Sequence, residues 1–137
     1  MTKVLLSLHV LAAIVAVGPV TVAASMFPAV VRRGDAAGLR TLHRICRVYA
    51  TVGVVVPVFG LATATSLGVL TDAWLLTSIG LTVAAAAVLG LAVLPGQATV
   101  LGGGTAARLS LATGVFNLLW ATVVVLMIVR PGSTTGV

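Results

Sequence analysis

The chain has 137 residues, of which 60% are hydrophobic and 7% are charged, and its formal net charge is +6. Soluble domains carry about 25% charged residues, and a domain of this size has too much surface for its volume to hide so many apolar side chains from water. The composition therefore excludes a soluble domain and predicts a single integral membrane domain over residues 1–137.

A helix needs about 20 apolar residues to cross the hydrocarbon core of a bilayer, and the chain offers four segments of that length or longer. The predicted spans lie at about residues 4–31, 49–70, 74–94 and 109–129. The fold class expected from them is all-α: a four-helix transmembrane bundle, with a short amphipathic cytoplasmic helix between spans 1 and 2.

The first span is long and contains the pair Gly18-Pro19. Proline lacks the backbone N–H of the helical ladder, so this pair predicts a kink. An alternative interpretation is a cleaved signal peptide, because Lys3 precedes the segment and Ala23–Ser25 has the small residues of a cleavage site. Its apolar stretch is longer than a signal core, and cleavage would leave the basic segment that follows on the outer side, so we expect the span to be retained.

Basic residues concentrate between the first two spans. Five of the eight Lys and Arg residues lie there: Arg32, Arg33, Arg40, Arg44 and Arg47. Such clustering encodes membrane topology rather than nucleic-acid binding. It predicts a cell-membrane protein with the segment 32–47 in the cytoplasm and both termini outside. Six basic residues then lie inside, Arg108 included, and two lie outside.

The second half of this segment has the pattern of an amphipathic helix. Asp35 is a candidate N-cap, and apolar residues recur at helical spacing from Leu39 to Tyr49. Arg40, Arg44 and Arg47 share another face, with His43 among them. The helix is expected near the lipid headgroups. Its arginines set topology and reach the interface, or alternatively form a cradle for anionic lipid headgroups or an acidic substrate.

Two further segments are predicted to lack regular structure. The segment 95–108 contains three consecutive glycines but no following Lys-Ser/Thr, so it is expected to be a flexible connector and not a phosphate-binding loop. The polar residues 132–137 are expected to be a short disordered tail.

His9 is the one titratable candidate expected to be buried within a predicted span. No Asp, Glu, Lys or Arg lies deep in any of the four spans. Ala12, Ala13 and Ala16 share its helix face, which predicts that His9 points into the bundle. Hydroxyl residues at a similar depth form a polar layer that would satisfy the imidazole: Thr63, Thr65, Ser66, Thr77 and Ser78.

Two roles remain open for His9. The first is a neutral, hydrogen-bonded packing residue. The second is a ligand of haem b or copper. A haem site formed by both histidines of one chain is not expected, because His43 lies beyond the opposite end of the first span, about 30 Å away across the bilayer.

The fourth span carries its own polar face. Thr113, Asn117 and Trp120 fall at positions i, i+4 and i+7. Polar side chains at this depth are costly against lipid, so the face is expected to point inward and form interhelical hydrogen bonds. The alternative is a pocket for a neutral solute.

The stretches "LLSLHVLAAIVAVGP" and "LHRICRVYATVGVVVPVFGLATA", with the four-span layout, resemble the DUF2269 family of integral membrane proteins. The chain is also distantly similar to copper-resistance D-type membrane domains and to HemJ-type protoporphyrinogen oxidases, whose first helix carries "LH" followed by small residues. That similarity implies a metal or haem ligand at His9 alone. The HemJ-type group also uses a lysine within a later helix, whereas the only lysine here is Lys3.

The predicted function is that of a non-enzymatic accessory, assembly or packing subunit of the membrane, because the spans contain no nucleophile–base pair and no carboxylate pair. The alternatives are a haem- or copper-binding protein that uses His9, and a transporter or channel for a neutral solute. The expected partners are the lipid bilayer, anionic headgroups at the arginines, and a second copy or another membrane protein. No nucleic acid is expected.

Overall fold

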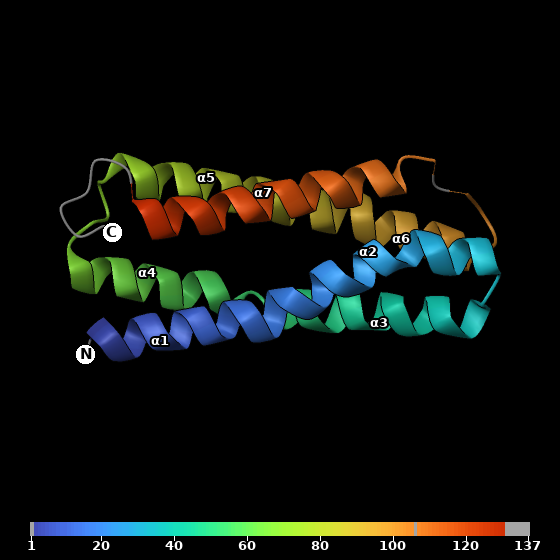
Figure 1. Cartoon of the computed structure of the whole chain (residues 1–137), viewed down its shortest axis with the longest axis horizontal. Coiled ribbons are helices and arrows are strands. Elements are labelled where there is room, and N and C mark those ends of the chain that lie inside the picture. Colours follow the sequence, from blue (N-terminus) through green and yellow to red (C-terminus); the bar gives the residue numbers. More distant parts are fainter. Residues whose placement is uncertain (1, 106, 131–137) are drawn as a thin grey trace.

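The computed structural model describes residues 2–105 and 107–130 and confirms an all-α four-helix bundle (Figure 1). The four rods are long and apolar enough to cross a membrane: Lys3–Arg33, Ala36–Leu67, Ala73–Leu101 and Leu109–Val129. Their helical elements, in chain order, are α1 (Thr2–Ala12), η1 (Ala13–Val17), α2 (Gly18–Arg33), α3 (Ala36–Val52), α4 (Val55–Leu67), α5 (Ala73–Val88), η2 (Leu89–Val93), α6 (Leu94–Leu101) and α7 (Leu109–Val129). The expected polar tail lies outside the described residues.

Three of the four rods are interrupted just before a proline. The π-helical turns η1 and η2 precede Pro19 and Pro95. A short turn at residues 53–54 separates α3 from α4, and Pro57 follows in the first turn of α4. Proline donates no backbone hydrogen bond, and a π-helical turn is one way for the backbone to adapt while the rod continues. The third rod therefore passes through Pro95. The expectation that residues 95–108 form a connector was wrong for its first part, which is the helix α6.

Neighbouring rods run antiparallel and pack in pairs: α1 with α4, α2 with α3, and α5 with α7 (Figure 1). Contacts of α2 with α7 and of α3 with α6 join these pairs at one end of the molecule. We call that end, which holds the turn at Gly34, the arginine end. The opposite end, which holds the turn at Gly68, is the His9 end.

The amphipathic helix expected between the first two spans is α3, which leads into the second span. The Asp35 carboxylate caps it by accepting from the backbone N–H of Gly38 at 3.0 Å. Gly34, with a φ of 67°, closes α2 in the left-handed conformation that glycine adopts freely, so the chain reverses within two residues. As a result α3 runs back along α2 and leads into α4 after a short turn (Figure 1).

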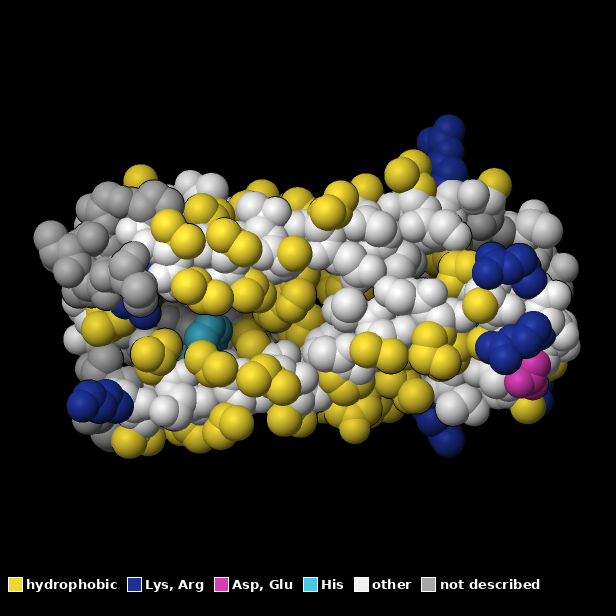
Figure 2. Space-filling model, viewed as in Figure 1, with side chains coloured by type: hydrophobic (Ala, Val, Ile, Leu, Met, Phe, Trp, Pro, Cys, Tyr) yellow, Lys and Arg dark blue, Asp and Glu magenta, His cyan; other side chains and the backbone are white. Residues whose placement is uncertain are grey.

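The apolar face of α3 forms much of the core at the arginine end. Leu39, Leu42 and Cys46 pack there with Phe27 of α2, which is fully buried. A second cluster around Trp74 closes the His9 end, and a third lies around Phe116. Outside the core, most of the Lys and Arg side chains lie towards the arginine end, on α2, α3 and the segment just before α7, while Lys3 and Arg130 belong to the other end (Figure 2). The bundle thus has an apolar lateral surface and a strongly basic end.

Candidate functional site

His9 is buried between α1 and α4, with 9% of its surface exposed. Its Nδ1 atom lies 2.9 Å from the backbone oxygen of Val56 on α4. A carbonyl oxygen can only accept a hydrogen bond, so Nδ1 carries the proton and donates it. The neutral imidazole then keeps a lone pair on Nε2.

Gly60 allows this contact. A helical side chain leans towards the N-terminus and covers the turn before its own Cα, so a side chain at position 60 would cover the carbonyl of Val56. Glycine leaves that carbonyl open. A Cβ atom built at Gly60 would lie 2.9 Å from Cε1 of His9, closer than real Cβ contacts. The ring of His9 therefore fills the space of the missing side chain.

Three of the five hydroxyl residues expected to form a polar layer around His9 form local hydrogen bonds instead. The hydroxyl groups of Thr63, Thr65 and Ser78 each donate to a carbonyl one turn earlier in their own helix, at 2.8 Å. These bonds are local, as is common for Ser and Thr in helices. The partner of His9 is a backbone carbonyl instead. The sequence signal for it was a glycine inside the second rod, where small residues permit close helix contact.

On the face shown in Figure 2, a hollow lies between the α1–α4 pair and the α5–α7 pair towards the His9 end, and histidine atoms are visible in it. Apolar side chains surround it in the same view. The histidine atoms belong to His9, because α1, α4, α5 and α7 contain no other histidine. The site thus combines an oriented imidazole with an opening between two helix pairs.

The polar face of the fourth rod meets α2. Asn117 donates from Nδ2 to the hydroxyl of Ser25 at 3.0 Å. Thr113 is buried one turn away on α7, and Trp120 is half-buried. The structure therefore places this face against a neighbouring helix, and the partner residue Ser25 was not singled out from the sequence.

Three side-chain atoms of this region are buried without a hydrogen-bond partner in the described part of the chain. They are Oγ1 of Thr21 on α2, and Oγ1 of Thr113 and Oδ1 of Asn117 on α7. We call the contact formed by Thr21, Ser25, Thr113 and Asn117 the α2–α7 seam. Buried polar atoms without a hydrogen-bond partner are uncommon in native interiors. The three oxygen atoms of the seam could therefore still form hydrogen bonds with a further group.

Three of the five predicted arginines come together in one pocket. Arg40, Arg44 and Arg47 line an open cavity of about 420 Å³ on the outer face of α3. Arg32 and Arg33 end α2 and do not line it. The other lining residues are His43, Val48, Thr51 and, from the end of α6, Leu101. We call this cavity the arginine pocket.

A buried chain of hydrogen bonds holds one wall of the arginine pocket. Nδ1 of His43 lies 2.9 Å from Oε1 of Gln97, which is fully buried on α6. Gln97 donates from Nε2 to the sulfur of Cys46 at 3.5 Å, and that thiol faces the carbonyl of Val20. The amide oxygen accepts, so His43 donates from Nδ1. Gln97, the only glutamine in the chain, was not singled out from the sequence.

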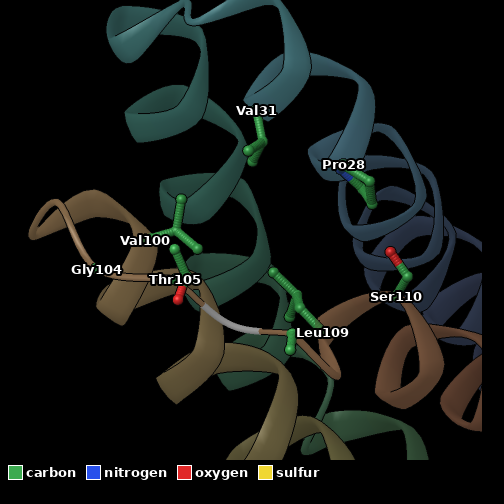
Figure 3. A pocket seen from close by; sticks show the side chains of 8 residues that line it. Pro28, Val31, Val100, Gly104, Thr105, Leu109 and Ser110 are labelled. Carbon is green, nitrogen blue, oxygen red and sulfur yellow. The ribbon is translucent and has the colours of Figure 1, made fainter.

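A second, smaller cavity of about 240 Å³ lies near the same end (Figure 3). Pro28 and Val31 of α2 face Val100 of α6 and the start of α7, at Leu109 and Ser110. None of its eight lining residues is titratable. It therefore offers apolar surface without groups for chemistry or ion binding.

No family model, no curated protein and no solved structure matches this chain. The resemblance to the DUF2269 family stays a prediction.

Proposed function

We propose that the chain is a non-enzymatic accessory protein of the cell membrane that assembles with a further transmembrane helix along the α2–α7 seam. The arginine end would face the cytoplasm and both termini the outside. The observation that carries the proposal is the hydrogen bond between Asn117 and the exposed Ser25.

The depth of this bond favours a partner helix. Asn117 is the ninth residue of α7, so it lies roughly 12 Å from the start of the helix, inside a hydrocarbon layer of about 30 Å. Ser25 accepts from Asn117, and the described residues provide no acceptor for its own O–H. Lipid tails cannot accept a hydrogen bond either, whereas a polar side chain of another helix can.

The surface beside the bond is open to such a helix. Gly114 of α7 is exposed, and no atom lies within 4 Å of a Cβ built there. Small residues of this kind let two helix backbones approach closely. Asn117 itself is engaged with Ser25, which favours helix packing over a solute pathway along this face.

The proposal is tested by a photoreactive amino acid at Leu118, which is 71% exposed and follows Asn117. In native membranes we expect one discrete cross-linked product, whose mass tells a second copy from another protein. Asn117→Leu should abolish the product, because it removes the polar contact of the seam. Thr122→Val is the matched control, because that hydroxyl donates within its own helix.

The same photoreactive group at Leu91, which is 80% exposed on η2, should give no discrete product. Equal cross-linking at both positions, or a product at Leu118 that survives Asn117→Leu, would contradict assembly along the seam.

A second candidate function rests on His9. Histidines that bind metals almost always donate their other ring N–H to a carbonyl or carboxylate, and His9 donates to Val56 in that manner. A haem iron needs as little as one axial imidazole, which fits His9, and it would supply one-electron chemistry. Copper fits less well, because the described residues contain no group of three His, Cys, Asp or Glu side chains that could hold a metal ion.

This candidate predicts a Soret band in the visible spectrum of the detergent-purified protein, recorded before and after reduction. His9→Ala should remove the band. His43→Ala should retain it, because His43 lies at the arginine end. A featureless spectrum of the wild-type protein, produced with haem supplied, would exclude the haem role and leave His9 as a packing residue.

A further inference from the structure

We propose that the arginine pocket binds the headgroup of an anionic phospholipid that carries two phosphates. Its three arginines share one face of α3 at positions i, i+4 and i+7, so they extend over roughly 10 Å of the helix. Guanidinium groups bind phosphate oxygens in pairs of parallel hydrogen bonds.

The positive charge of the pocket is not neutralised within the described part of the chain. The whole sequence contains two acidic residues, Asp35 and Asp72. Asp35 caps α3, and Asp72 lies beside Trp74 at the His9 end. No carboxylate lines the pocket. Three neighbouring cations without a partner favour an anion with more than one negative charge.

The arginine pocket has walls that are held in place by other side chains, unlike a patch of arginines on an open surface. The ring of His43 is fixed in its wall by Gln97, which is itself fully buried and bonded to Cys46. Leu101 closes another side from α6. Helices α3 and α6, which α4 and α5 separate in the chain, thus form one cavity, and a ligand in it would touch both.

The position of the pocket along the rod favours a lipid over free phosphate. The rod Ala36–Leu67 has 32 residues and is about 48 Å long, against a hydrocarbon core of about 30 Å. Counting about 20 residues back from Leu67 reaches Val48, so the arginines fall at or beyond the boundary of the core. They lie in the layer where lipid phosphates are found.

Apolar surface continues from the pocket towards the middle of the rod. Val48, which lines the pocket, and Val52, one turn further along α3, are both about half exposed. A lipid can place its phosphates on the arginines and its acyl chains along these valines. Free phosphate would use none of this surface.

The test compares two triple variants of the full chain, purified in detergent. Arg40→Gln/Arg44→Gln/Arg47→Gln removes the cations of the pocket. Arg32→Gln/Arg33→Gln/Arg108→Gln removes the same charge from the same end, at residues outside the pocket lining. The probes are cardiolipin, phosphatidylglycerol, phosphatidylcholine and inorganic pyrophosphate. Retained lipid is counted by native mass spectrometry, and apparent affinity is taken from the shift of the melting temperature.

We expect the wild type and the control triple to retain one cardiolipin, with affinities within about threefold of each other because screened surface charges contribute little. The pocket triple should bind about 100-fold more weakly, since each arginine near a lipid surface contributes a factor of about five. If the pocket triple does not fold, Arg44→Gln alone should weaken binding about fivefold.

Three results would overturn the proposal. Equal weakening by both triples would make the effect one of overall charge. Equal binding of phosphatidylglycerol and cardiolipin would remove the requirement for two phosphates. Pyrophosphate bound as tightly as cardiolipin would make free phosphate the ligand instead of a lipid.

Discussion

Gly60→Ala is expected to destabilise the bundle by about 2 kcal/mol, because the new methyl group enters the space of the His9 ring. The added Cβ would lie 2.9 Å from Cε1 of His9. The ring can move away only by giving up its hydrogen bond to Val56, and hydrogen bonds between membrane helices contribute about 0.6 kcal/mol on average. Thermal unfolding in detergent, followed by circular dichroism, measures the loss.

Two controls separate the clash from a general effect of the substitution. Gly80→Ala lies in another helix, at a position where a Cβ meets no atom within 4 Å, so it should leave the melting temperature nearly unchanged. In the background of His9→Ala, the Gly60→Ala substitution should cost little, because the ring that it meets is gone. A full cost in that background would show that the contact between the two residues is not the cause.

Phe27→Ala is expected to have the larger effect, about 3 kcal/mol or more. Phe27 is fully buried between α2 and the apolar face of α3, so its truncation leaves a cavity that its neighbours fill only in part. Lipid tails are as apolar as the side chain, and the cost therefore comes from lost packing rather than from transfer out of water. Equilibrium unfolding in mixed micelles gives the free energy.

Leu118→Ala is the companion measurement, since this side chain is 71% exposed on the surface of the bundle. Its truncation should change the free energy of unfolding by less than about 0.5 kcal/mol. Similar losses at both positions would contradict the assignment of Phe27 to the core.

The fold could be predicted from the sequence because twenty-residue apolar segments leave few alternatives to membrane-spanning helices. The fourth rod has the predicted ends, Leu109 and Val129. The second and third rods are longer than their apolar cores. Hydropathy does not detect the first half of the second rod, whose polar residues face outward while its apolar face packs on α2. It also treats Pro95 as an end, although the backbone accommodates it in a π-helical turn.

In the contacts of His9 and of Asn117, one of the interacting residues could be predicted from the sequence and the other could not. Periodicity indicated that His9 and Asn117 face other helices. It could not supply Val56, Gly60 or Ser25, because these contacts depend on which rods become neighbours. Gln97 was missed for a related reason: it lies in a segment that was predicted to lack structure.

The interruptions near the prolines divide the bundle into two halves. Different contacts hold the helix pairs together in each half. At the arginine end, contacts of α2 with α7 and of α3 with α6 connect the helix pairs. At the His9 end, the cluster around Trp74, which includes Ala64 of α4, connects them beside the hollow (Figures 1 and 2). The fourth rod alone is an uninterrupted α-helix along its whole length. The breaks near Pro19 and Pro57 therefore lie between the His9 site and the basic end, and the fourth rod joins both ends without such a break.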